Sequence, residues 1–267
     1  MRHSILREHL QQHRNLVKGV SNLVYIIICI FGLLIGSFLN VCIYRIPKGE
    51  SIAFPPSHCS RCNHSLSALD LIPVVSYLAL KGRCRYCKEK ISYQYPVVET
   101  LVSVLFLLIY LQYGYTFQGL AALIMVCLLV VVAFIDLNLM IIPNRMNLII
   151  AGIGILVLFL GWGVTWKDSF LGGLIGGGIL LLLGGLSSWL LHKEGMGGGD
   201  IKLMAACGLY LGAVKVVWAL MISVYIAGAI LIVMLVSKKL KRDQQVSFGP
   251  FLSAGTIFVI LFYDKLF

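Results

Sequence analysis

The chain has 267 residues, of which 59% are hydrophobic and only 12% are charged. Apolar runs of roughly 17–25 residues recur, which is the length that spans a bilayer as a helix, so the composition excludes an ordinary soluble domain. The formal net charge of +11 is typical of loops that face an anionic cytoplasmic surface, and we expect membrane lipid and no nucleic acid as a partner.

The N-terminal part is polar up to residue 21 and then becomes apolar. Residues 1–21 hold four arginine or lysine residues and three histidines, and they are predicted to form a basic tail. The first membrane span is predicted over about residues 23–44. This run is too long for the apolar region of a typical signal peptide, and no small-residue cleavage site follows it, so we expect no cleaved leader.

Residues 45–96 form the one sizeable polar segment, and they carry two C-x2-C pairs separated by 21 residues. The spacing is close to that of a four-cysteine zinc site, which would stabilise a segment too small for a core of its own. Disulfides are the alternative and require an oxidising compartment. Eight lysine and arginine residues place the segment in the cytoplasm, which favours reduced thiols and structural zinc. The predicted ligands are Cys59, Cys62, Cys84 and Cys87.

Further apolar runs follow closely after residue 97, and with the first they predict about eight transmembrane helices. The run 201–212 is too short to cross a bilayer fully unless it borrows residues from the preceding loop. The fold class is therefore an all-α polytopic membrane protein with one cytoplasmic, zinc-ribbon-like loop. The predicted spans after the first are 97–113, 119–135, 147–162, 170–191, 201–212, 214–236 and 248–264.

The orientation of the spans follows from the basic loops. If residues 45–96 are cytoplasmic, alternation puts 136–146, 192–200 and 237–247 on the same side. That side then holds 15 lysine and arginine residues, against 7 on the other side, which agrees with the positive-inside rule. The basic N-terminal tail argues mildly against this orientation.

Two aspartates lie at the ends of apolar runs on this cytoplasmic side. Asp136 follows the run 120–135, and Asp200 follows the glycine-rich break Gly195–Gly199. Acids at membrane depth are costly, so they are candidates for function, and two adjacent carboxyl groups share a proton. One then activates water while the other polarises a carbonyl group. The alternative is that both are ordinary charges at helix ends, and Glu99 is as well explained as an interfacial charge or an arginine partner as by catalysis.

These motifs together closely resemble those of the type IV prepilin peptidases, the bifunctional leader peptidase/N-methyltransferases. The resemblance covers nearly the whole chain from about residue 30. The glycine–aspartate motif alone is weak, because presenilin-type proteases also have it, but its combination with the four-cysteine loop is highly specific. The matching stretches are Gly36–Pro47, Phe54–Cys62, Asp70–Tyr77, Gly82–Cys87, Ile91–Glu99, Asp136 with Ile142–Asn144, Gly195–Leu203 and Phe248–Leu252.

The resemblance implies an aspartic protease of the bacterial cytoplasmic membrane, with Asp136 and Asp200 as the catalytic pair facing the cytoplasm. Such enzymes cut prepilin-like precursors after a basic leader and then methylate the new N-terminal residue, usually Phe, with S-adenosylmethionine. The four-cysteine loop is associated with methylation. The domains implied are a basic tail (1–21), the first span with the cysteine loop (22–96), and a helical protease domain (97–267).

Three other functions fit parts of the pattern. A proton-coupled transporter would use the two acids as a relay, but it should show broken helices in both halves, and only one glycine break is present. A zinc-bearing membrane scaffold would tolerate loss of either acid. A presenilin-like protease without methyltransferase activity is disfavoured by the cysteine loop. The sequence does not distinguish pilin from pseudopilin substrates, nor does it indicate oligomeric state or the residues that contact S-adenosylmethionine.

Overall fold

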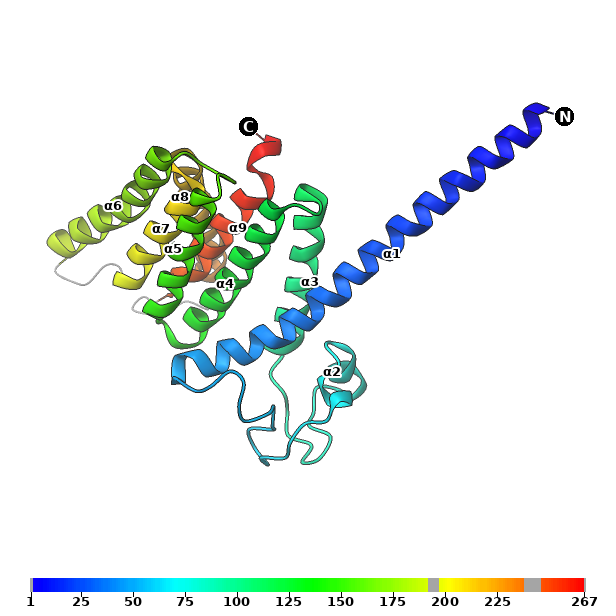
Figure 1. Ribbon diagram of the computed structural model, residues 1–267. Coiled ribbons are helices and arrows are strands. Elements are labelled where there is room, and N and C mark those ends of the chain that lie inside the picture. Colours follow the sequence, from blue (N-terminus) through cyan, green and yellow to red (C-terminus); the bar gives the residue numbers. More distant parts are fainter. Residues whose placement is uncertain (1, 192–196, 238–245, 267) are drawn as a thin grey trace. The chain divides into compact units, whose positions relative to one another are not determined.

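The computed structural model of the chain is almost entirely helical (Figure 1). It describes residues 2–191, 197–237 and 246–266, and the side chains of residues 22–189 within the first of these ranges. In these ranges the β-structure is limited to two isolated bridges, His58 with Ser65 and Arg83 with Lys90. The predicted all-α class is thus confirmed.

The predicted spans correspond to helices, but the count of eight transmembrane helices is not confirmed. Six helices in the described ranges are long and apolar enough to cross a membrane, which fits a multi-pass membrane protein. The remaining two, α5 and α7, have 16 and 14 residues and fall short of that length. The helices are α1 (Arg2–Arg45), α2 (Val75–Ala79), α3 (Gln94–Tyr113), α4 (Phe117–Leu139), α5 (Asn144–Phe159), α6 (Trp166–Leu191), α7 (Gly198–Leu211), α8 (Ala213–Val236) and α9 (Gly249–Leu266), with short 3-10 turns at Ile46–Lys48 and Ala68–Leu71.

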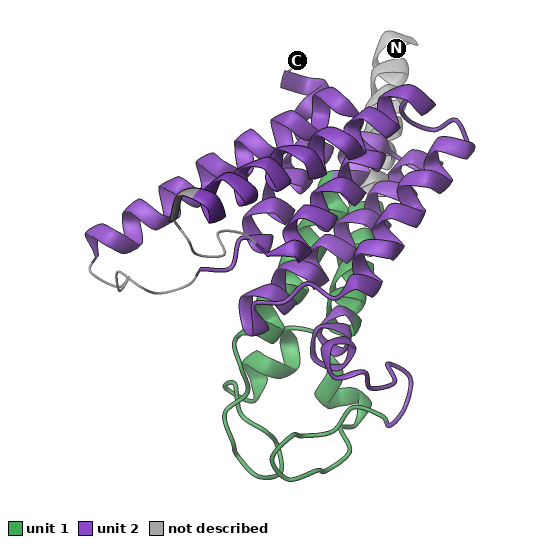
Figure 2. Ribbon diagram, turned by 90° about the vertical axis from the view of Figure 1, so that its left-hand side faces the viewer, with its two compact units in different colours: residues 1–38, 56–108 green, residues 39–55, 109–267 purple. Residues whose placement is uncertain are grey.

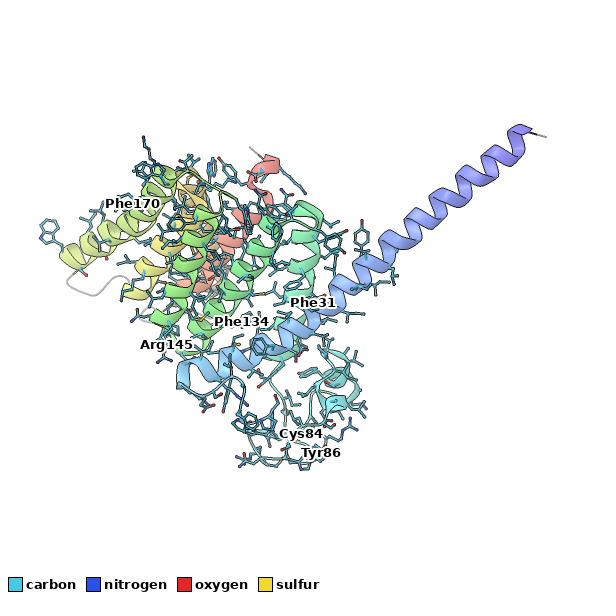
Figure 3. All side chains as sticks on the ribbon, viewed as in Figure 1. Phe31, Cys84, Tyr86, Phe134, Arg145 and Phe170 are labelled. Atoms are coloured by element: carbon cyan, nitrogen blue, oxygen red, sulfur yellow. The ribbon has the colours of Figure 1, made fainter. Side chains whose placement is uncertain are left out.

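The chain divides into two compact units (Figure 2). Unit 1 comprises residues 1–38 and 56–108, and unit 2 comprises residues 39–55 and 109–267. In unit 1, α1 and α3 pack together through a hydrogen bond of 2.9 Å from the Ser103 hydroxyl to the Cys29 carbonyl, and the rings of Phe31 and Phe106 lie 6.1 Å apart. Phe31 is labelled in Figure 3.

Unit 2 is a bundle in which α7 contacts α5, α6, α8 and α9. The closest approach is between α6 and α7, where a Cβ atom at Gly208 would collide with the carbonyl oxygen of Gly172. Only glycine at these positions lets the two backbones meet. The most apolar span is α4, with a mean hydropathy of 3.0, and most of its side chains are buried or half-buried. Because it contacts four other helices, the short α7 lies in the interior of the bundle.

Both aspartate-bearing helices extend further than the apolar runs predict. The α4 helix continues past Asp136 to Leu139 and ends where Met140 adopts a left-handed conformation, with φ 55° and ψ 35°. The α7 helix begins at Gly198, so Asp200 lies in its first turn and not before it. Of the predicted glycine break, Gly195 and Met196 lie outside the described residues. Hydrophobicity locates the apolar part of a helix, whereas backbone hydrogen bonds decide where it ends.

Candidate active site and four-cysteine cluster

Asp136 lies in the last turns of α4, and its carboxyl group points towards the start of α9 within the same unit. The residue is 5% exposed, and its Oδ2 accepts a buried hydrogen bond of 2.9 Å from the backbone N–H of Gly249. This N–H belongs to the first residue of α9, where helices have donors without partners inside the helix. An ideal Cβ atom at Gly249 would lie 2.6 Å from Oδ2, so glycine is required for this contact.

Asp200 approaches the same place from α7. A Cβ atom at Gly199 would lie 3.0 Å from Cβ of Ile142, and one at Gly249 would lie 3.1 Å from Cδ1 of the same isoleucine. The first turns of α7 and α9 therefore both pack on Ile142, and the Asp136 carboxyl is close enough to interact electrostatically with Asp200. The structure thus brings together the two acids that the sequence singled out.

Asp200 has an unusual environment for a carboxyl group. Its carboxyl group is half-buried and lies near that of Asp136, an arrangement in which two carboxyl groups share a proton. Its Oδ1 atom is buried and has no hydrogen-bond partner among the described residues. A buried acceptor without a donor is costly, so this oxygen is suited to a water molecule, a substrate group or its own proton.

The start of α5 fixes the first turn of α7 on both sides of Asp200. The Asn147 amide, on a residue that is 5% exposed, donates a hydrogen bond of 3.3 Å to the Gly199 carbonyl. Three residues earlier, the Asn144 side-chain oxygen accepts a bond of 3.0 Å from the Lys202 ammonium. These contacts, and that of Gly249, were not predicted as functional. The sequence feature that could have indicated the two asparagine contacts is that Asn144 and Asn147 lie three residues apart, on one face of a helix that begins directly after Pro143.

The four predicted cysteine ligands also meet, all within unit 1. Their sulfur atoms lie within 4.8 Å of one another, and the Sγ atoms of Cys59 and Cys87 are 3.8 Å apart. Tetrahedral Zn–S bonds of about 2.3 Å imply sulfur–sulfur separations of about 3.8 Å, so the cluster fits a four-thiolate zinc ion. Backbone hydrogen bonds lower the pKa of Cys59 to about 7, which favours the thiolate that a metal requires.

Each C-x2-C pair forms a tight turn closed by backbone hydrogen bonds. In the first turn the N–H of Asn63 donates to the Cys59 carbonyl at 2.8 Å. In the second, the N–H of Lys88 donates to the Cys84 carbonyl at 3.1 Å. Figure 3 labels Cys84 and Tyr86 of the second turn. Such turns present two sulfur atoms from each pair to a common point.

Asp70 joins the second turn to the preceding segment. Its side chain is 3% exposed, its Oδ1 lies 2.6 Å from Nε of Arg85, and its Oδ2 accepts the Ser67 hydroxyl at 2.7 Å. The Arg85 guanidinium, helped by Ser67, holds the pKa of Asp70 at about 2. Asp70 begins one of the stretches that resemble the prepilin peptidases, but its ion pair with Arg85 was not predicted from the sequence.

Glu99 is also buried, with 5% exposure, in the second turn of α3. The backbone N–H of Val74 donates a hydrogen bond of 2.7 Å to its Oε2 atom. The Ser37 side chain also hydrogen-bonds to it. The sequence suggested an arginine as a partner of Glu99. In the structure its hydrogen-bond partners are instead Ser37 of α1 and the backbone of Val74 in the loop.

The fold and these two groups define a class: a multi-pass helical membrane protein that pairs one buried and one half-buried carboxyl group and gathers four thiols in a polar loop. The sequence profile of the bacterial peptidase A24 N-terminal domain matches residues 30–113, and that of the type IV leader peptidase family matches residues 123–233. The chain belongs to the type IV leader peptidase family and is an enzyme. This finding does not favour the presenilin-like or transporter alternatives.

Several relatives match along most of their length. A prepilin leader peptidase/N-methyltransferase of Aeromonas salmonicida is 33% identical, over 94% of this chain and 95% of that protein. Proteins of the same name from Bacillus subtilis and Neisseria gonorrhoeae are each 34% identical, covering 90% and 85% of this chain and 95% and 86% of their own. No solved structure matches the chain significantly.

Proposed function

We propose that this chain cleaves the basic leader from prepilin-like precursors and then methylates the new N-terminal residue with S-adenosylmethionine. The observation that carries the proposal is the meeting of Asp136 and Asp200 around Ile142, in a chain of the type IV leader peptidase family. The substrates are prepilin or pseudopilin precursors, whose own membrane helix brings the scissile bond to the membrane surface. The enzyme is a protein of the bacterial cytoplasmic membrane, with this site at the cytoplasmic face.

Asp136 and Asp200 act as one unit that holds a single proton. Asp200, whose buried Oδ1 has no hydrogen-bond donor among the described residues, is suited to carry that proton and to donate it to the scissile carbonyl oxygen. Asp136 then takes a proton from the attacking water, while the Gly249 N–H fixes the orientation of its carboxyl group. Because the two groups titrate together, the proton belongs to the pair in the resting state.

The two activities lie in different parts of the chain. Residues 97–267 form the protease domain, and residues 22–96, following the basic tail 1–21, carry methylation. Cys59, Cys62, Cys84 and Cys87 hold a structural zinc ion, whose binding stabilises a loop that has little hydrophobic core. S-adenosylmethionine supplies the methyl group when it is bound.

The proposal is tested with a prepilin in membranes, the wild-type chain and S-adenosylmethionine, followed by mass spectrometry of the product. We expect loss of the leader and the gain of one methyl group on the new N-terminus. Without S-adenosylmethionine, cleavage should continue and the methyl group should be absent. An intact precursor after incubation with inserted, folded enzyme would refute the protease assignment.

Gly249→Ala should reduce cleavage about a hundredfold, because displacing a catalytic group by about 1 Å has effects of this size. The added Cβ would lie 2.6 Å from Oδ2 of Asp136 and would displace either the carboxyl group or the start of α9. The matched control is Gly228→Ala in α8, where a Cβ atom has no neighbour within 4 Å. Initial rates on the same prepilin test this, and equal rates for both variants would contradict the role of Gly249.

A further inference from the structure

Residues 69–79 of unit 1 combine an inward-facing charge with outward-facing apolar side chains. Asp70 is the segment's one charged residue, yet its side chain is 3% exposed and ion-paired. Five large apolar side chains are instead exposed by 39% to 68%. This arrangement is the reverse of what water favours, and exposed apolar patches mark interaction sites. The five are Leu69, Leu71, Ile72, Val75 and Leu78.

The segment is fixed beside the beginning of a membrane span. The Val74 N–H donates to Glu99 at 2.7 Å, and Glu99 is the sixth residue of α3, which is a candidate span from its first residue, Gln94. At about 1.5 Å per residue, Glu99 lies about 7–8 Å along the helix from that start. Amphipathic segments at a membrane surface bury their apolar face by a similar depth, about 5–10 Å. Val74 therefore lies at interfacial depth.

The attachment to α3 is held by a rare turn. The Val75 N–H donates to the Pro73 carbonyl at 2.6 Å across Val74, which has φ 60° and ψ −47°. This is a classic γ-turn, which is strained, and more so for a β-branched residue. Such conformations persist where the surroundings hold them, and the buried Glu99 carboxyl does so here.

The charges that follow the segment also suit a membrane surface. Lys81 and Arg83 are exposed and come directly after the apolar residues. Basic side chains beside an apolar face attract anionic lipid headgroups. The loop is tethered to membrane spans at both of its ends, by α1 before it and α3 after it. The bilayer is therefore the partner that is always within reach.

We propose that residues 69–79 dock on the lipid bilayer, with Leu69, Leu71, Ile72, Val75 and Leu78 in the boundary between headgroups and acyl chains. The Glu99–Val74 contact sets their depth. The four-cysteine cluster, which Asp70 and Arg85 join to this segment, is thereby held at the membrane surface.

The test is quenching of tryptophan fluorescence by brominated lipids, with the full chain in lipid vesicles. Leu78→Trp replaces a side chain that is 68% exposed, and Glu89→Trp is the control, an exposed position in the second cysteine turn. The chain has 4 native tryptophans, so the signal is the difference from the wild type. Lipids brominated near the carbonyl end of the acyl chain should quench the added Leu78→Trp fluorescence by about half or more, and lipids brominated near the methyl end should quench it less. The fluorescence added by Glu89→Trp should be quenched by neither lipid.

Equal, weak quenching of both variants would overturn the proposal, because the patch would then face water. A blue-shifted but unquenched Leu78→Trp signal would also overturn it, because the patch would then be covered by protein, such as a second copy of the chain. Circular dichroism and elution as a single species check that the variants fold. If Leu78→Trp does not fold, Leu69→Trp, at a position that is 66% exposed, gives the same reading.

Discussion

Asp136→Asn and Asp200→Asn should each lower the rate of prepilin cleavage by about a thousandfold or more. Each change removes one carboxyl group from a pair that acts as a unit, so either single change should have almost the full effect of both. Proton transfer by such groups contributes factors of about 10²–10⁴, and the paired mechanism uses it in both directions. The amide is nearly isosteric with the carboxyl group, and in Asp136→Asn its oxygen still accepts the Gly249 N–H.

The control for these variants is Asp168→Asn, in the same unit. Asp168 accepts the backbone N–H of Ala213 at 3.1 Å at the junction of α7 and α8, and an amide oxygen preserves that contact. All three variants should reach the membrane in wild-type amounts, and only Asp168→Asn should cut normally. Normal cleavage by either Asp136→Asn or Asp200→Asn would exclude the paired mechanism.

The double variant Cys59→Ser/Cys87→Ser should lose the bound metal and methylation while it retains cleavage. A structural zinc ion contributes about 10–16 kcal/mol in small zinc-binding peptides near neutral pH, far more than a loop of this size obtains from its core. Without the metal, the two cysteine turns have little to hold them together. Unit 2, which contains both aspartates, should still fold.

Metal analysis of the purified protein and mass spectrometry of the cleaved pilin measure these two effects. The wild type should contain one zinc ion per chain. Cys29→Ser is the matched control, because Cys29 lies on α1 away from the four-thiol cluster. Methylation at the wild-type rate by a metal-free protein would show that the cluster has another role, without affecting the assignment of the aspartates.

The sequence predicted the elements that follow from hydrophobicity and from local spacing. The apolar runs located every long helix, and the C-x2-C pairs indicated a cluster whose four sulfur atoms the structure brings within 4.8 Å. Asp136 and Asp200 could be singled out because acids are rare in apolar surroundings. Their catalytic role remains a prediction, although the two residues do come together.

Contacts made by the backbone could not be predicted in this way. The Gly249 N–H that binds Asp136 belongs to a residue more than a hundred positions away, and the sequence indicated only that Gly249 lies at the beginning of the predicted span 248–264. The γ-turn at Val74 contradicts the conformational preference of valine and depends on Glu99. The ends of α4 and α7 differ from prediction for the same reason, since helix termini depend on hydrogen bonds that hydropathy does not report.

The shortness of α7 links the chemistry to the thickness of the membrane. Its 14 residues extend for about 21 Å, whereas the hydrocarbon layer is about 30 Å deep. Its C-terminal end passes directly into α8 at Gly212, so the shortfall falls at the end that carries Asp200. Because α7 lies among four other helices of the bundle, water must enter the bundle from that end to reach the carboxyl group. A thicker bilayer would lengthen this path for water, so we expect leader removal to become slower as the acyl chains of the host membrane become longer.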